Sequence, residues 1–270
     1  MTTSPPLGPQ ARRRPAPLRA VVVRTTQLTP RLRRVTVTGE GFDRFRWPGP
    51  AGHLKLLIPE PGAPDVNLPE TDADGTVAFA GTAMPTMRTY TASQFRADTH
   101  ELDIDVVLHG DGPAAAWALQ VRPGGRLAVS VPRTSGFTED PTADWVLLAG
   151  DASALPAIAT IAPTVTKPTT IVLEVAGPAE QLDLGRPVQW LTAAAHHDVD
   201  DGDALTPLEQ ALRSFDQPVG RGQVWVAGEA AVIRRIRARL LAELHRDQVV
   251  TRGYWRAGQQ NHPDHDYGDD

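Results

Sequence analysis

Four consecutive residues, Arg88-Thr89-Tyr90-Thr91, combine side chains suited to a phosphorylated aromatic ligand. Alternate side chains of an extended strand share a face, so Arg88 and Tyr90 would lie together, opposite the two threonines. Arginine offers a planar set of donors for phosphate oxygens, and tyrosine offers a flat ring for stacking. A ligand with both groups is a nucleotide cofactor. The alternative is an ordinary strand with an exposed arginine, and these four residues alone leave it open.

A second candidate binding segment covers residues 108–117, where a strand-like run passes through Gly110 and Gly112 into an alanine-rich helical stretch. Small residues let a backbone approach a ligand closely, and the free amides at a helix start suit a pyrophosphate. Trp117 would lie one turn into this helix, where its indole could pack on adenine. A strand–turn–helix junction with Trp117 in the core explains the same residues, so both interpretations stay open.

Two further segments resemble strand ends that bind dinucleotides. Residues 148–156 pass from an apolar run through Gly150 and Asp151 into a helical stretch, and Gly228-Glu229 ends a later apolar run on the same predicted edge. Dinucleotides bind at the carboxyl ends of such strands. The pattern is not G-x-G-x-x-G, which argues against a standard Rossmann dehydrogenase. Purely structural turns are the alternative for both segments.

Near the C-terminus, two adjacent aromatic residues stand between two arginines in Arg252-Gly253-Tyr254-Trp255-Arg256. An aromatic ring here could cover a flat cofactor, and the arginines could meet an anionic ligand; a terminal strand with one aromatic packed inward is the alternative. The histidines and aspartates of residues 262–270 are metal-ligand types, but we interpret that stretch as a solvated tail. We predict no metal site.

Composition restricts the function classes open to the chain. A length of 270 residues, 41% of them hydrophobic, accommodates two domains. The net charge of -5 and pI near 5.9 argue against a nucleic-acid-binding protein. The absence of cysteine excludes disulfides, thiolate metal sites and a cysteine nucleophile. No apolar run approaches the roughly 20 residues of a membrane helix, and the run at 20–23 is shorter than the about 7 residues of a secretory signal's core, so we expect a cytoplasmic protein without membrane insertion. We also expect a monomer.

Hydrophobic patterning predicts two different domains. Over residues 18–132 apolar and polar residues alternate between Gly-, Pro- and Asp-rich turns, most clearly at 101–108 and 126–131, which is typical of an antiparallel Greek-key barrel. Continuous apolar runs at 145–149, 171–175, 188–191 and 224–228 then alternate with helical stretches, which predicts a doubly wound parallel α/β domain. We therefore expect a flexible tail at 1–17, the barrel at 18–135, the α/β domain at 136–258 and an acidic tail at 259–270.

Taken together, the segments resemble the siderophore-interacting proteins, which are flavin-dependent ferric-siderophore reductases related to the ferredoxin–NADP reductases. The resemblance extends from about residue 20 to residue 258. It is carried by residues 53–59, 87–91, 108–117, 150–158, 226–229 and 253–256. It implies that the barrel binds FAD and that the α/β domain binds NAD(P)H.

The resemblance also implies roles for single residues. Arg88 would pair with the flavin pyrophosphate, while Tyr90 and Thr91 would meet the isoalloxazine and are the candidate catalytic residues. Lys55, Arg252 and Arg256 would receive the anionic ferric siderophore. The candidate cofactor-binding residues are Arg88, Thr89, Tyr90, Thr91, His109, Gly110, Gly112, Pro113, Ala114, Trp117, Gly150, Asp151, Ser153, Ala154, Pro156, Glu174, Gly228, Glu229, Tyr254 and Trp255.

The implied reaction transfers a hydride from NAD(P)H to FAD and then single electrons to siderophore-bound Fe(III). Reduction to Fe(II) loosens a complex built from hard oxygen donors, so iron would be released for assimilation without a protein ligand. NADH is favoured over NADPH because Glu174-Val175-Ala176-Gly177-Pro178 offers no cation for a 2′-phosphate. The alternatives are a reductase of a ferredoxin or flavodoxin, and a non-catalytic binder of siderophore or flavin.

Three positions depart from the family pattern. The family usually has arginine at the place of Ser93, a hydroxyl residue near Ala115, and Glu-Thr at Ala152-Ser153. Each change removes or shortens a polar contact to a cofactor. A neutral hydrogen bond contributes about 1 kcal/mol and a charged one about 1.5–3 kcal/mol, so we expect weaker cofactor binding but not its loss.

Overall fold

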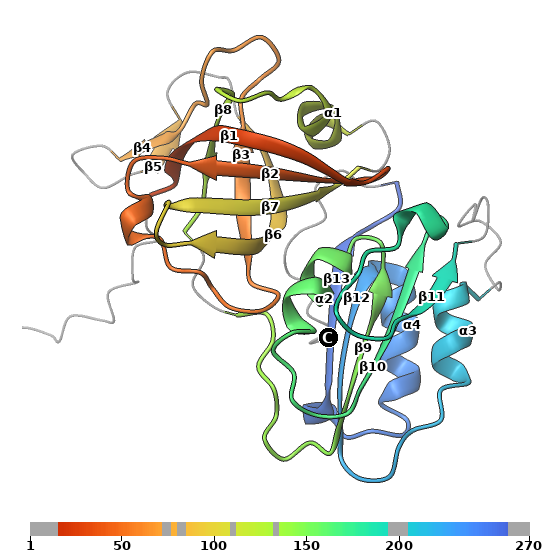
Figure 1. Ribbon diagram of the computed structural model, residues 1–270. Coiled ribbons are helices and arrows are strands. Elements are labelled where there is room, and N and C mark those ends of the chain that lie inside the picture. The colour runs from red at the N-terminus through yellow and green to blue at the C-terminus, as the bar shows by residue number, and fades with distance from the viewer. Residues whose placement is uncertain are drawn as a thin grey trace, which may run out of the picture.

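The computed structural model describes residues 16–71, 77–79, 85–108, 112–131, 135–193 and 205–258. Over these residues a closed antiparallel barrel precedes a five-stranded parallel sheet (Figure 1). This is the two-part fold class that the hydrophobic patterning predicts. Most of the predicted N-terminal tail and all of the C-terminal tail lie outside the described residues, so their boundaries stay predictions. None of the described helices is long and apolar enough to cross a membrane.

Six antiparallel strands close the barrel in the order β1-β2-β7-β6-β3-β8. They are β1 (Leu18–Thr29), β2 (Leu32–Thr38), β3 (His53–Ile58), β6 (Thr86–Arg96), β7 (Glu101–Val107) and β8 (Arg126–Val129). The elements beside them are η1 (Phe42–Arg44), the paired strands β4 (Pro69–Thr71) and β5 (Val77–Phe79), and helix α1 (Pro113–Gln120). Helix α1 packs Ala114 and Ala118 into the barrel core.

The alternation in β7 places apolar side chains inward and carboxylates outward. Asp103 and Asp105 are nevertheless buried, because arginines of the neighbouring strands cover them. Arg34 binds Asp105 through Nε and Nη2 at 2.7 and 2.8 Å, and Arg96 binds Asp103 through both Nη atoms at 2.7 Å. Burial raises the pKa of Asp103, but its bonds to Arg96 and Thr36 outweigh burial and leave that pKa below its usual value.

The second domain is a parallel sheet in the order β11-β10-β9-β12-β13. Its strands are β9 (Trp145–Asp151), β10 (Thr169–Val175), β11 (Gln189–Thr192), β12 (Gly222–Glu229) and β13 (Val249–Trp255). Its helices are α2 (Leu155–Ile161), η2 (Pro178–Glu180), α3 (Pro207–Arg213), α4 (Ala230–Leu240) and η3 (Arg246–Gln248). One apolar cluster joins α2 to one face of the sheet and another joins α3 and α4 to the other face.

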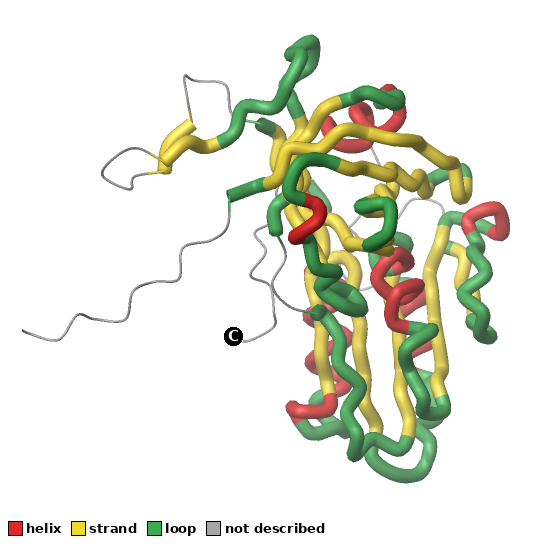
Figure 2. Tube along the Cα trace, turned by 60° about the vertical axis from the view of Figure 1, so that its left-hand side comes forward, coloured by secondary structure: helices red, strands yellow, loops and turns green. Residues whose placement is uncertain are grey.

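The parallel strands point their carboxyl ends toward the barrel, and the two domains lie one above the other (Figures 1 and 2). After β9 the chain adds β10 and then β11 on one side of that strand, and it later adds β12 and then β13 on the other side. The sheet order therefore reverses between β9 and β12. Dinucleotides bind at such a reversal point, outside the carboxyl ends of the strands.

Candidate functional site

Strand β6 carries the four predicted cofactor-binding residues Arg88, Thr89, Tyr90 and Thr91. It pairs with β3, so Leu54 lies opposite Tyr90 and Lys55 opposite Thr89. Tyr90 packs against the barrel core, and burial raises the pKa of its phenol to about 12 although the nearby Arg88 acts to lower it. The phenol therefore stays protonated at neutral pH and can donate a hydrogen bond.

Arg88 and Thr91 complete this part of the site. The Arg88 guanidinium donates one hydrogen bond from Nη1 to the carbonyl of Met87 at 2.8 Å. Thr91 is buried, at 7% exposure. Exposure alternates along residues 87–90, with Arg88 and Tyr90 the less exposed pair. This alternation is what a shared face for Arg88 and Tyr90 predicts.

The predicted strand–turn–helix around residues 108–117 has its helix at the expected place. His109 and Gly110 lie outside the described residues. Gly112 is the N-cap of α1 and its backbone is extended, and no side chain among the described residues caps the helix. Trp117 is half-buried and packs against the barrel core, as its structural interpretation expects. The open start of α1 offers backbone amides and the positive end of the helix dipole.

Asp151 joins the ends of three strands at the reversal point. Its Oδ1 accepts hydrogen bonds from the Ser153 amide at 2.8 Å and the Ser153 hydroxyl at 2.5 Å. Its Oδ2 accepts from the Glu229 amide at 2.9 Å and from Nε1 of Trp255 at 2.8 Å. One carboxylate thus fixes the turn after β9, the end of β12 and the exposed indole at the end of β13.

The two glycines predicted at these strand ends are required by contacts inside the protein. A Cβ on Gly150 would lie 2.4 Å from the carbonyl oxygen of Ala227 and 2.4 Å from the Cβ of Ala154. A Cβ on Gly228 would lie 2.7 Å from Oδ2 of Asp151. Small residues here let β9, β12 and the start of α2 approach one another, which the structural interpretation of the turns anticipates.

Both predicted glutamates, Glu174 and Glu229, hold helix starts. Glu174 accepts a hydrogen bond from the Leu208 amide at 2.8 Å, in the first turn of α3. Glu229 is 7% exposed and accepts from the Val232 amide at 2.9 Å, which caps α4. Carboxylates at helix starts are stabilised by the unpaired amides and the helix dipole.

The two aromatic residues of β13, Tyr254 and Trp255, differ in their surroundings. Tyr254 packs inward with its ring edge toward Trp225, at a centroid distance of 6.3 Å, and burial raises the pKa of its phenol. Trp255 is 37% exposed. One aromatic packs inward, as the alternative expects, and the contact of Trp255 with a cofactor stays a prediction. Arg252 donates to the Thr251 carbonyl at 2.9 Å, and Arg256 follows the strand directly.

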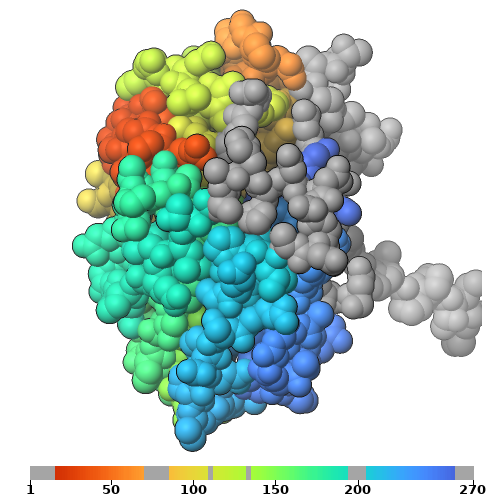
Figure 3. All heavy atoms as spheres, turned by 90° about the vertical axis from the view of Figure 1, so that its right-hand side faces the viewer, coloured from red at the N-terminus to blue at the C-terminus, as the bar shows by residue number. Residues whose placement is uncertain are grey.

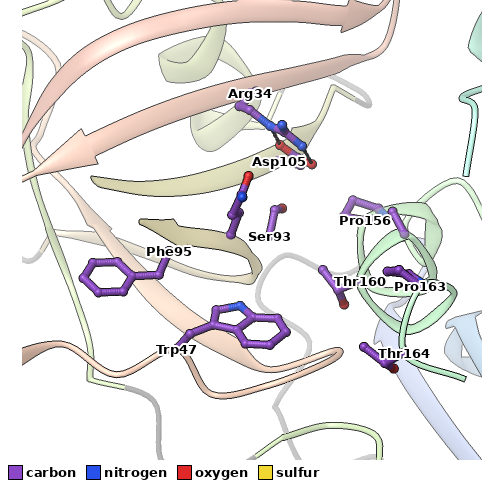
Figure 4. Close-up of a pocket in the computed structure, with 11 residues that line it drawn as sticks. Arg34, Trp47, Ser93, Phe95, Asp105, Pro156, Thr160, Pro163 and Thr164 are labelled. Atoms are coloured by element: carbon purple, nitrogen blue, oxygen red, sulfur yellow. Dashed lines mark hydrogen bonds and ion pairs between the residues drawn. The ribbon is translucent and has the colours of Figure 1, made fainter. Parts of the chain in front are cut away.

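Sequence reasoning missed a pocket of about 390 Å³ between the domains (Figure 4). Residues of β2, β6 and β7, together with Trp47, form one wall, and α2 with the turn after it forms the other. Ser93 lies on the barrel wall at a bulge of β6, and its buried hydroxyl has no hydrogen-bond partner among the described residues. The only signal in the sequence was the departure from the family pattern at Ser93. Pro156, a predicted site residue, lines the opposite wall.

Comparison with known proteins agrees with this architecture. Residues 21–136 match the family model of the siderophore-interacting FAD-binding domain, and residues 143–258 match that of the siderophore-interacting protein. The ferric vibriobactin reductase ViuB of Vibrio cholerae is 31% identical over 90% of this chain and 91% of its own length. The NADPH-dependent ferric-chelate reductase of Escherichia coli is 30% identical over 87% of this chain and 91% of its own.

A solved structure extends the agreement to three dimensions. A siderophore utilization protein from T. fusca superposes with a TM-score of 0.77 at 30% identity, over 94% of this chain and all of that one. Its match includes both the barrel and the parallel sheet. The chain therefore belongs to the siderophore-interacting protein family, and its barrel is that family's FAD-binding domain.

Proposed function

We propose that the protein is a reductase that uses FAD to pass electrons from a nicotinamide nucleotide to the iron of a ferric siderophore. The observation that carries this proposal is the pairing, in one chain, of the FAD-binding barrel with a parallel sheet whose reversal point faces it. The full-length similarity to a ferric vibriobactin reductase supports the choice of acceptor.

The donors of the barrel fit FAD. Arg88 offers a guanidinium for the pyrophosphate, and the open start of α1 adds backbone amides of the same polarity. Tyr90 offers a flat ring and a protonated hydroxyl, and Thr91 follows it on the strand. We assign these residues to FAD, together with His109, Gly110, Gly112, Pro113, Ala114 and Trp117. When bound, FAD supplies the chemistry that links a two-electron donor to a one-electron acceptor.

The nicotinamide nucleotide is assigned to the edge where β9 and β12 end. Ser153, Ala154 and Pro156 lie in or beside the first turn of α2, next to Gly150 and Asp151. Because both oxygens of Asp151 already accept hydrogen bonds from the protein, this carboxylate shapes the turn that receives the nucleotide. Trp255 is held beside it and is 37% exposed, so its ring can contact a ligand there.

The substrate is assigned to cations at the rim of both domains. Lys55 lies on β3, beside the strand that carries Arg88 and Tyr90. Arg252 and Arg256 lie on and after β13, at the carboxyl end of the sheet. Positive charge suits an anionic chelate. Hard oxygen donors prefer Fe(III) to Fe(II), so reduction itself releases the metal.

Purified protein is expected to show flavin absorption bands, at least after FAD is added, and to be reduced faster by NADH than by NADPH. The reason for the donor preference is the acidic Glu174 at the end of β10, where a 2′-phosphate would be repelled. Anaerobic stopped-flow absorbance with each donor measures both rates. Protein that binds no FAD would contradict the proposal, a flavin reduced by neither donor would indicate a non-catalytic binder, and faster reduction by NADPH would overturn the donor preference alone.

Replacing Lys55 by alanine is expected to raise the KM for a ferric siderophore about 10-fold or more and to leave flavin reduction by NADH unchanged. A bond between an ammonium group and an anion contributes about 1.5–3 kcal/mol, and 1.4 kcal/mol is tenfold in affinity. Lys167→Ala is the matched control, because Lys167 is the only other lysine and lies in the α/β domain. If Lys55→Ala changes nothing and a ferredoxin is reduced rapidly, the acceptor is a protein instead.

A further inference from the structure

One carboxylate of the α/β domain is buried against the barrel. Glu180, the last residue of η2, is 8% exposed. Its Oε2 accepts a hydrogen bond from the Thr29 hydroxyl at 2.6 Å and one from the Arg31 amide at 3.0 Å. Thr29 and Arg31 belong to the tight turn between β1 and β2. In Figure 3 the segment after β10 lies directly against this end of the barrel.

Arg31 continues the connection toward the proposed FAD site. Its carbonyl accepts a hydrogen bond from the Leu108 amide at 2.8 Å. Leu108 is the last described residue of the segment that leads from β7 into Gly112 and α1. The Arg31 backbone therefore makes two contacts. Its N–H donates to Glu180 of the α/β domain, and its C=O accepts from Leu108, which precedes Gly112 and α1.

Apolar contacts hold the same turn in place. Leu32 is 2% exposed and belongs to the apolar cluster of α2 and the parallel sheet. Leu28 and Val107 from the barrel, and Leu182 and Leu184 from the segment after Glu180, pack on that cluster. The turn between β1 and β2 is therefore anchored in the core of the other domain, with Glu180 as its polar contact.

We propose that Glu180 is a positioning residue that fixes the α/β domain against the turn between β1 and β2 and, through the Arg31 backbone, against Leu108 at the entry to the proposed FAD site. The inference rests on the proposed function, because it assigns the α/β domain to the nucleotide and the start of α1, with Gly112, Pro113 and Ala114, to FAD. Removing the carboxylate leaves the Thr29 hydroxyl and the Arg31 amide without their acceptor inside an interface. A misplacement of about 1 Å between reacting groups can cost about 100-fold in rate, so a loosened interface slows the step between the domains.

The test compares Glu180→Ala with Glu180→Gln, whose amide oxygen still accepts from both donors. Amide hydrogen exchange at Arg31 and Leu108, measured without nicotinamide, is expected to accelerate in Glu180→Ala and not in Glu180→Gln. NADH-dependent flavin reduction is expected to slow about 10- to 100-fold in Glu180→Ala. Oxidation of dithionite-reduced protein by a ferric siderophore involves no hydride transfer from the nicotinamide, so it is expected to slow less than NADH-dependent flavin reduction in Glu180→Ala.

Glu139→Ala serves as the matched control. Glu139 accepts hydrogen bonds from Thr166 and Lys167 within the α/β domain, so its loss removes similar bonds without touching the barrel. If Glu180→Ala folds poorly, Thr29→Val removes one donor and keeps the carboxylate. Unchanged exchange at Leu108, or equal slowing of both half-reactions, would overturn the proposal. If wild-type flavin is reduced by neither donor, the proposed function fails, and hydrogen exchange still decides whether Glu180 holds the turn.

Discussion

Replacement of Arg88 by alanine is expected to raise the dissociation constant of FAD about 10- to 100-fold, so that the protein is purified with little flavin. A charge-assisted hydrogen bond contributes about 1.5–3 kcal/mol, and 1.4 kcal/mol corresponds to a factor of ten. The guanidinium is already oriented in this protein, since Arg88 is half-buried and donates to the Met87 carbonyl. Little side-chain entropy is then lost when a phosphate binds.

Titration of apoprotein with FAD, followed by flavin fluorescence, measures this loss. Arg88→Lys is expected to fall between wild type and Arg88→Ala, because lysine keeps the charge without the planar set of donors. Arg44→Ala is the control: this barrel arginine is 88% exposed at its side chain and pairs only weakly with Asp43, at 3.7 Å. Wild-type affinity in Arg88→Ala, with an intact circular dichroism spectrum, would show that Arg88 does not bind the pyrophosphate.

The sequence pattern predicts the barrel's inward face well and its outward face poorly. Leu102, Ile104 and Val106 alternate along β7 and are all buried in the core. Asp103 and Asp105 look like solvent-facing residues in the same alternation, but each is 2% exposed. Their arginine partners stand on β2 and on β6. Which strands become neighbours of β7, and in which register, is decided by barrel closure, which a local pattern does not contain.

In the α/β domain, too, the sequence predicts only part of the contacts at the carboxyl ends of the parallel strands. Continuous apolar runs predict buried strands, and β12 is buried at every position. The hydrogen bond from the Val232 amide to Glu229, which caps α4, can be predicted from the sequence because it joins residues three positions apart. The contact of Glu174 with Leu208 spans 34 residues, and that of Asp151 with Trp255 spans 104. These contacts depend on strand order, so residue type and spacing point to the edge without giving the partners of its side chains.

Asp151→Asn is expected to lower the free energy of unfolding by about 2–4 kcal/mol and to raise the KM for NADH, with FAD affinity unchanged. Each carboxylate oxygen accepts two hydrogen bonds. An asparagine can present its oxygen to only one pair of donors, and its NH₂ group then faces the other pair. Losing two bonds to a charged acceptor costs about 1.5–3 kcal/mol each, reduced here because the site is partly exposed to water.

Urea unfolding measures the loss of stability, and steady-state kinetics measure the KM for NADH. A double-mutant cycle with Trp255→Phe shows how much of the loss of stability comes from the hydrogen bond between Asp151 and Trp255. Trp255→Phe keeps an aromatic ring and removes one donor to Asp151, so we expect it to be milder than Asp151→Asn. If both residues act through their shared hydrogen bond, the double variant loses less stability than the two single losses added together. Full additivity would mean that Trp255 is held by other contacts. An unchanged KM for NADH in Asp151→Asn would mean that the turn after β9 does not receive the nucleotide.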